Sequence, residues 1–238
     1  MICFLTSRTD DPITGELNPA NRFIDELSKC FPEHCRALTI CSDPDDHGTT
    51  DYYSNLTRIC FENAGFHFES FKILDGRNEG FAKDLINESN LLFLSGGHVP
   101  TQNRFFQKIR LRELIKDFNG IIIGISAGSM NSADLVYARA ELEGEAADPS
   151  YQKYFEGLGL TKTMLVPHHQ DVRDVVLDGL RLFEDITCSD SYGKTFYSIP
   201  DGSYLYIDSC KEELRGEAYM IKDGVIRQIS SDDETIVL

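Results

Sequence analysis

The chain has 238 residues, of which 41% are hydrophobic, and its formal net charge is −16. This length and apolar content are enough for one sizeable core, so we expect a single α/β domain over residues 1–238. A strongly acidic protein repels phosphate backbones and anionic headgroups, so neither nucleic acid nor a membrane surface is an expected partner. No apolar run is long enough to span a bilayer.

Seven cysteines are present, an odd number, and no two of them form a C-x-x-C pair. This pattern favours reduced, mostly structural thiols rather than a disulfide framework or a metal site. We therefore expect a cytoplasmic protein. The cysteines are Cys3, Cys30, Cys35, Cys41, Cys60, Cys188 and Cys210.

The first third of the chain alternates apolar runs with amphipathic segments. Residues 1–5 form a short apolar run that predicts a buried strand, and Asn18-Pro19 resembles the start of a helix. The predicted elements that follow are a strand over 37–41, a helix over 52–64 and a strand over 66–74.

The middle of the chain continues this alternation, whereas the end departs from it. Continuous apolar strands separated by helices predict a mostly parallel central sheet with helices on both faces. The C-terminal stretches instead predict antiparallel strands, with Asp223-Gly224 as a hairpin turn. The expected elements are strands over 91–94 and 120–125, helices over 101–116 and 171–184, and strands over 203–208 and 218–229.

Residues 124–128 read Gly-Ile-Ser-Ala-Gly and directly follow the apolar strand ending at Ile125. A helix over 130–137 would complete a strand–turn–helix unit, which is the context of a nucleophile elbow. Such a turn is strained at its centre and needs small neighbours, a need that the glycines and Ala127 meet. We therefore expect Ser126 to be an exposed nucleophile rather than a simple helix cap.

A serine nucleophile needs a base, and the base needs an orienting acid. His168 and His169 follow a short apolar run that ends at Pro167, and the ends of strands are where open α/β sheets collect their site residues. At this level either histidine could be the base. The acid is equally open, because Asp134, Glu141, Glu143 and Glu145 all follow the elbow. Gly96-Gly97, at the end of another strand, could bring a backbone N–H close to a substrate oxygen.

These residues together resemble the dipeptidase E and cyanophycinase family of serine peptidases, which have a class I glutamine amidotransferase-like fold. The resemblance rests on Leu94-Ser95-Gly96-Gly97, on the elbow at 124–128, and on Leu158-Gly159-Leu160 followed by Val166-Pro167-His168. It runs from the first strand to the terminal hairpin. Three departures concern the substrate site: His98 after the glycine turn, His169 after the histidine, and a shorter loop beyond it.

The resemblance implies a role for each of six residues. It implies a triad of Ser126 as nucleophile, His168 as base and Glu141, 15 residues after the serine, as acid. It implies an oxyanion hole from Gly97 and Ala127. Arg173 aligns loosely with a family arginine that would hold an acidic substrate group.

We accordingly expect a serine exopeptidase for small peptides, with aspartyl dipeptides as substrates and neither cofactor nor metal. A hydrolase of β-aspartyl-arginine polymer is the nearest alternative, and a catalytically silent binding protein of the same fold is the alternative from another class. The expected partner is a small peptide, and a homodimer is the alternative to a monomer. An ordinary lipase fits less well because its histidine lies much further beyond the serine, and a glutamine amidotransferase would have Cys at the elbow.

Overall fold

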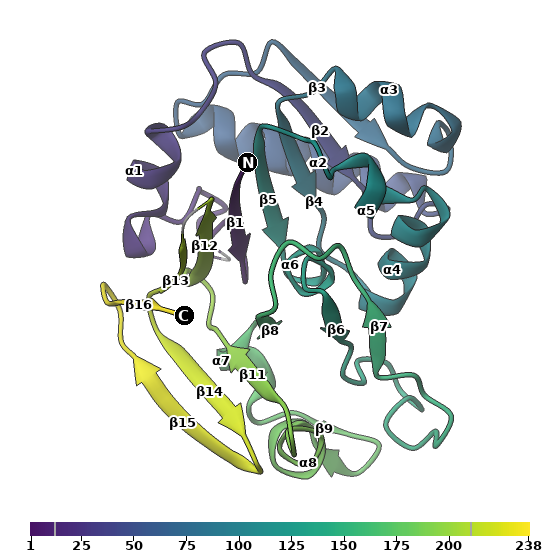
Figure 1. Cartoon of the computed structure of the whole chain (residues 1–238), viewed down its shortest axis with the longest axis vertical. Helices are drawn as coiled ribbons and strands as arrows, with labels where there is room; N and C mark the ends of the chain where they lie inside the picture. Colours follow the sequence, from purple (N-terminus) through teal and green to yellow (C-terminus); the bar gives the residue numbers. More distant parts are fainter. Residues whose placement is uncertain (12, 210) are drawn as a thin grey trace.

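The computed structural model describes residues 1–11, 13–209 and 211–238. Its main sheet has eight strands in the order β16-β13-β12-β1-β5-β4-β2-β3, and the five from β1 to β3 run parallel (Figure 1). The bounds are β1 Ile2–Thr6, β2 Arg36–Ile40, β3 Ser70–Leu74, β4 Leu91–Leu94, β5 Ile121–Ile125, β12 Tyr204–Asp208, β13 Lys211–Arg215 and β16 Thr235–Val237.

Helices cover both faces of this sheet, and the alternation of side chains along the strands explains why. In β4, Leu92 and Leu94 point into one apolar cluster, and Leu91 and Phe93 point into the other. The first cluster includes residues of α3, α4 and α5, and the second includes residues of α1 and α2. The bounds are η1 Ala20–Arg22, α1 Phe23–Ser28, α2 His47–Asn63, η2 Glu79–Phe81, α3 Ala82–Asn87, α4 Val99–Lys108 and α5 Leu111–Leu114.

A second, four-stranded sheet in the order β15-β14-β11-β8 lies below the main sheet in Figure 1, beyond the carboxyl ends of its parallel strands. Strands β8 and β11 pair in parallel, and the others pair antiparallel. The bounds are β8 Met164–Val166, β11 Thr195–Ser198, β14 Ala218–Lys222 and β15 Val225–Ser230. The remaining elements are α6 Ala127–Asn131, β6 Leu135–Tyr137, β7 Tyr154–Glu156, α7 His169–Val172, β9 Val176–Leu177, β10 Leu180–Arg181, η3 Leu182–Thr187 and α8 Cys188–Asp190.

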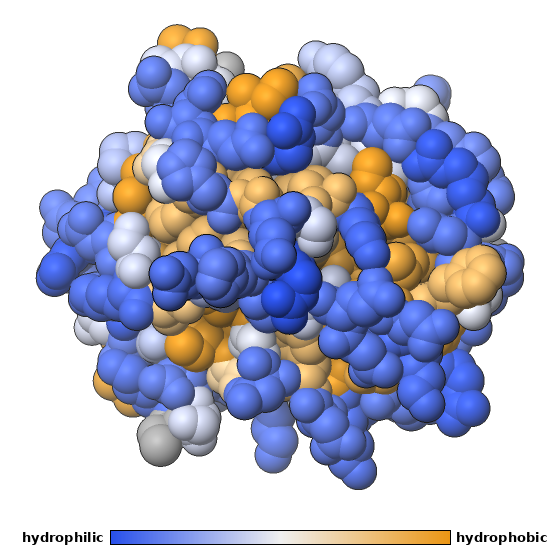
Figure 2. Space-filling view, turned by 90° about the horizontal axis from the view of Figure 1, so that it is seen from above, coloured by the Kyte–Doolittle hydropathy of each residue, from blue (hydrophilic) through white to orange (hydrophobic). Residues whose placement is uncertain are grey.

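The predicted fold class is confirmed: a largely parallel central sheet is followed by antiparallel C-terminal strands. Asp223 and Gly224 both have positive φ, 49° and 81°, and form the predicted turn between β14 and β15. Hydrophilic side chains dominate the face seen from above in Figure 2, with apolar ones showing between them. None of the described helices combines the length and the apolar character needed to cross a membrane. Six cysteines are free, and Cys210 lies outside the described residues.

Three helix predictions need correction. The segment 130–137 leaves the helix after Asn131 and becomes β6, because its last residues pair with β7. The segment 101–116 is divided at Arg110, whose φ of 55° interrupts the helix between α4 and α5. The segment 171–184 holds a hairpin instead of a long helix, since Asp178-Gly179 has positive φ at both residues and turns β9 back onto β10.

Candidate active site

Five turns meet where the second sheet adjoins the carboxyl ends of the parallel strands of the main sheet. Ser7 follows β1, Gly97 follows β4 and Ser126 follows β5, so the parallel arrangement brings all three to one edge of the main sheet. From the second sheet, His168 follows β8 and Asp201 follows β11, and these two strands are parallel neighbours. Parallel strands gather the residues beyond their carboxyl ends, which is why residues so far apart in the sequence come together.

The turn at Ser126 is strained and tightly packed. Ser126 has φ 49° and ψ −109°, a backbone conformation that costs free energy for a residue other than glycine. Its N–H donates to the carbonyl oxygens of Thr6 and Ser7 at 3.1 Å each, which holds the turn against β1. Gly128 is required by close approach, because a Cβ there would lie 2.1 Å from the carbonyl oxygen of Leu94.

His168 lies between a serine and a carboxylate. Its Nε2 is 2.9 Å from Oγ of Ser126, and its Nδ1 is 2.8 Å from Oδ1 of Asp201. His168 itself has positive φ, 59°, which turns it away from the direction of β8. His169 is not part of this line: its Nδ1 bonds to Oγ of Ser198, and its ring stacks on Tyr219 at 3.8 Å between centroids.

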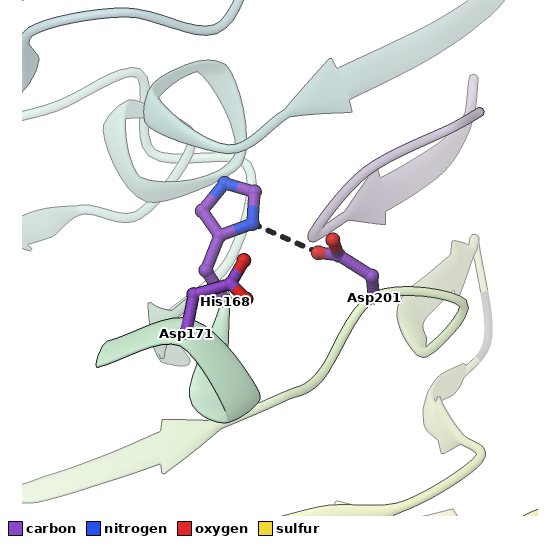
Figure 3. A group of neighbouring side chains, drawn as sticks. All are labelled: His168, Asp171 and Asp201. Carbon is purple, nitrogen blue, oxygen red and sulfur yellow. Dashed lines mark hydrogen bonds and ion pairs between the residues drawn. The ribbon is translucent and has the colours of Figure 1, made fainter. Parts of the chain in front are cut away.

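Figure 3 shows the imidazole of His168 with Asp201 on its Nδ1 side. Burial alone would raise the pKa of Asp201, but the hydrogen bonds from His168 and Ser7 outweigh burial and hold that pKa below its usual range. The carboxylate is therefore a fixed negative charge beside the imidazole. Its other oxygen, Oδ2, is buried and has no hydrogen-bond partner among the described residues.

Ser7 connects the two sheets at this point. The side chain is fully buried, its hydroxyl donates to Oδ1 of Asp201 at 2.6 Å, and it accepts from the backbone N–H of His168 at 2.8 Å. The backbone carbonyl of the same residue accepts from N–H of Ser126. One residue of β1's turn thus contacts all three members of the Ser126–His168–Asp201 line.

Glu141 does not occupy the position expected for the acid, because Asp201 takes Nδ1 of His168. The chain runs from α6 into β6, which pairs with β7, and this path carries Glu141 into a separate polar group. Its backbone N–H bonds to Glu145, and burial raises its pKa although Arg139 nearby opposes the shift. The acid was expected 15 residues after the serine, and that interval did not take this course of the chain into account.

The two predicted oxyanion residues lie beside Ser126. Ala127 begins α6, and the first N–H groups of a helix have no partner within the helix. In the other glycine turn, a Cβ on Gly96 would lie 3.5 Å from Cβ of Ser126. Gly97 has φ 149° and packs on Ser42, where a Cβ would lie 2.4 Å from Oγ, so only glycine fits.

A cavity of about 520 Å³ opens beside Ser126 and His168. Its walls come from the turns after β1, β2 and β4 and from one face of α2. Arg8 lines this cavity, whereas Arg173 is not among the lining residues. The side chain of Arg173 is 59% exposed and its closest ion-pair partner is Asp174, at 3.6 Å.

His168, Asp171 and Asp201 also form a group that could hold a metal ion, since one ligand atom of each lies within 4.8 Å of the others (Figure 3). Asp171 is exposed on α7 and accepts a hydrogen bond from Gln170. A metal ion here would have to displace the direct bond between His168 and Asp201.

A family model described as peptidase family S51 matches residues 24–214. The chain belongs to peptidase family S51. It is therefore a serine-type peptidase of the peptidase E and cyanophycinase group. The search of curated proteins finds no match.

Solved structures share the S51 fold at low sequence identity. A peptidase from an acI-B1 actinobacterium has a TM-score of 0.65 and 17% identity, with 100% of this chain and 96% of that chain covered. A "Putative Peptidase E Protein" from Listeria monocytogenes EGD-e has a TM-score of 0.57 and 15% identity, with 96% of this chain and 98% of that chain covered. These similarities show the fold.

Two residues of the assembled site, Ser7 and Asp201, were missed by sequence reasoning. Each carried a signal of position: Ser7 follows the first apolar strand, and Asp201 lies in the Pro200-Asp201-Gly202 turn. The turn residues were consistent with an ordinary loop, and nothing local showed that β11 pairs with β8.

Proposed function

We propose that this S51 peptidase hydrolyses short peptides through a triad of Ser126, His168 and Asp201. The observation that carries the proposal is the continuous line of hydrogen bonds, 2.9 Å from Ser126 to His168 and 2.8 Å from His168 to Asp201. Both distances lie within the range for a nucleophile, its general base and the base's orienting acid. The family match supports the same chemistry from an independent direction.

In the proposed reaction, Oγ of Ser126 attacks the peptide carbonyl carbon while Nε2 of His168 takes the hydroxyl proton. Asp201 stabilises the resulting imidazolium and fixes the tautomer that carries a proton on Nδ1. The oxyanion is bound by the N–H groups of Gly97 and Ala127, as in other acyl transfers. His168 then gives its proton to the leaving amine, and the C–N bond breaks.

The acyl-enzyme is hydrolysed by the same groups in reverse order. His168 takes a proton from a water molecule as its oxygen attacks the acyl carbon. It returns that proton to Oγ of Ser126 as the ester bond breaks, which releases a carboxylic acid and restores the enzyme. The cavity of about 520 Å³ is of a size that suits a short peptide rather than a folded protein.

An exopeptidase specific for aspartyl dipeptides is the finer form of this proposal, and a β-aspartyl-arginine polymer is its alternative substrate. The predicted selector of an acidic substrate was Arg173, whose exposed position and pairing with Asp174 lend it little support. Arg8 is the arginine at the cavity, and Asp10 accepts hydrogen bonds from its Nε and Nη2. Preference for aspartyl substrates therefore stays a prediction.

The grouping of His168, Asp171 and Asp201 gives the test of the triad a contrasting outcome, which is metal-dependent hydrolysis at the same place. Such hydrolysis predicts loss of activity on chelation and no covalent adduct on serine. The serine mechanism predicts the reverse on both counts, and a silent binding protein predicts neither activity nor an adduct.

The test is to treat the purified protein with a fluorophosphonate and map the adduct by mass spectrometry, with and without 1,10-phenanthroline. We expect one adduct, on Ser126, and no effect of the chelator. Ser129→Ala is the matched control, because Ser129 lies three residues beyond Ser126, in α6, and its hydroxyl donates to the carbonyl of Thr6. A protein that resists labelling, or that hydrolyses peptides only when metal is present, would reject the serine mechanism.

A further inference from the structure

One face of α2 forms a long wall of the cavity. Its lining residues recur at helical spacing, from Asp46 before the first turn to Cys60 near the end. The wall is polar near its start, at Asp46, Thr49 and Thr50, and mostly apolar further along, with Thr57 as the exception. The apolar residues are Tyr53, Leu56, Ile59 and Cys60.

Three of these apolar side chains are uncovered in the free protein. Tyr53 is 61% exposed, Leu56 is 41% exposed and Ile59 is 39% exposed. Covering large apolar groups inside a cavity with an apolar ligand is favourable, because it removes their surface from water. Since this wall is continuous with Ser126, the substrate itself is the natural occupant.

The charges around the cavity are mostly negative. Asp10, Asp43 and Asp46 line it, and Arg8 is the one arginine or lysine among the lining residues that the structure describes. Arg8 is already paired with Asp10, at 3.1 Å. This pairing leaves two carboxylates, Asp43 and Asp46, without a matching positive charge in the lining.

These two carboxylates line the same cavity as Gly97 and Ser126. They belong to the turn between β2 and α2, and Ser42 in that turn packs directly on Gly97. The N–H of Thr49 bonds to Asp46 and keeps the pKa of that carboxyl below its usual range, so it is ionised at neutral pH. In a peptide's first residue the α-ammonium and the carbonyl carbon are bonded to the same Cα, so a carboxylate that lines the same cavity as Ser126 can pair with the ammonium.

We propose that the preferred substrate is a short peptide with a free N-terminal ammonium and an uncharged, apolar first residue. The ammonium pairs with Asp43 and Asp46, and the apolar side chain covers Tyr53, Leu56 and Ile59. This inference rests on the proposed serine mechanism for its catalytic step. This differs from the aspartyl preference that the family resemblance implies: an acidic first residue is disfavoured, because it would bring a carboxylate into a cavity already lined by Asp43 and Asp46.

The first experiment compares kcat/KM for leucyl and aspartyl p-nitroanilides, each with a free and an acetylated amino group. We expect the leucyl substrate to exceed the aspartyl one by about tenfold or more, in the range that a shaped pocket provides. Acetylation removes the ammonium and should lower kcat/KM for the leucyl substrate by a similar factor. Faster hydrolysis of the aspartyl substrate would overturn the inference while leaving the serine mechanism intact.

The second experiment neutralises the two carboxylates with the double variant Asp43→Asn, Asp46→Asn. Asn is as good a helix N-cap as Asp, so α2 should keep its start. We expect about a tenfold loss in kcat/KM for the free amine and little change for the acetylated substrate. Asp45→Asn is the matched control, because Asp45 lies in the same turn but does not line the cavity. Equal losses in the double variant and the control would contradict the role of Asp43 and Asp46.

A binding measurement separates this inference from the catalytic proposal. Titration calorimetry on Ser126→Ala should show tighter binding of Leu-Leu than of Asp-Leu, without turnover. If fluorophosphonate fails to label the native enzyme, the serine mechanism is wrong, and this comparison still decides the substrate class. Equal or tighter binding of Asp-Leu would overturn it.

Discussion

The site has two halves that are built differently. One is the turn at residues 124–128, and the other is the pair of turns that follow β8 and β11. The turn is continuous in sequence: strand, serine and helix follow one another. Gly124 packs on Ser129 of α6, and Gly128 packs on Leu94 of the neighbouring strand β4. The other half is assembled from the turns after two strands: His168 follows β8 and Asp201, 33 positions later, follows β11, and pairing of the two strands brings them together.

This difference explains why the position of Ser126 could be predicted from its local motif and that of Asp201 could not, whereas His168 was predicted from the family resemblance. The residues around Ser126 match a recognisable strand–turn–helix motif, so the turn that carries Ser126 could be predicted from sequence. The carboxylate beside His168 depends on which strand lies next to β8, which is a long-range property. A fixed interval from the serine pointed to Glu141, whereas pairing of β8 with β11 brings Asp201 to the imidazole.

The largest expected effect is in the locally built half. Ser126→Ala should lower turnover by on the order of 10⁶, the loss seen when a triad serine protease loses its nucleophile. The fold should survive, because the hydroxyl of Ser126 contacts His168 and supports no strand or helix. Steady-state kinetics with a thermal melt would check both statements. Hydrolysis at the native rate by this variant would remove Ser126 from the mechanism.

The next effect tests the assembled half. Asp201→Asn should lower kcat by about 10⁴, the loss found when the acid of a serine protease triad becomes an amide. Glu141→Gln is the matched comparison, and we expect its kcat to stay within about threefold of the native value. Kinetics on the two variants in parallel measure the contrast.

The reverse result would restore Glu141 as the acid. A large loss in Glu141→Gln with a small one in Asp201→Asn would mean that the imidazole turns toward Glu141 during catalysis. Losses of equal size would mean that the two carboxylates act together.

Much of the fold followed from sequence because its signals are local. Apolar runs marked the parallel strands, and Asp223-Gly224 marked the terminal hairpin. The errors occurred where pairing overrides helical periodicity, as at β6 and at the β9–β10 hairpin. Ser7 was also missed because of long-range contacts: its place in the site depends on residues 119, 161 and 194 positions away.

A smaller effect is expected where the two halves are joined. Ser7→Ala removes a hydroxyl that donates to Asp201 and accepts from the N–H of His168. We expect kcat to fall about 10- to 100-fold with little change in KM, since hydrogen bonds to charged groups contribute about 1.5–3 kcal/mol. Kinetics with a saturable dipeptide substrate would separate the two constants.

Thr6→Val is the control for Ser7→Ala. Thr6 is also buried on β1, and its hydroxyl donates to the carbonyl of Gly124 rather than to Asp201. It should lower stability while leaving kcat nearly unchanged. Equal losses of kcat in the two variants would reduce Ser7 to a structural role.

The smallest expected effect is on the stability of the fold, and it comes from the Asp201–His168 pair. Hydrogen bonds from His168 and Ser7 overcome the effect of burial and lower the pKa of Asp201, so its ionised form is favoured in the folded state. A carboxyl with a lowered folded-state pKa contributes stability above its unfolded pKa of about 4, and that contribution is lost as pH falls through the folded value. Urea unfolding of native protein and Asp201→Asn should therefore show a difference that is constant near neutrality and shrinks below about pH 4. The amide of the variant does not titrate. If the difference in unfolding free energy is therefore the same at pH 7 and pH 3, the charge of the carboxylate does not stabilise the fold. Its hydrogen bonds would then orient His168 without strengthening the junction of the two sheets.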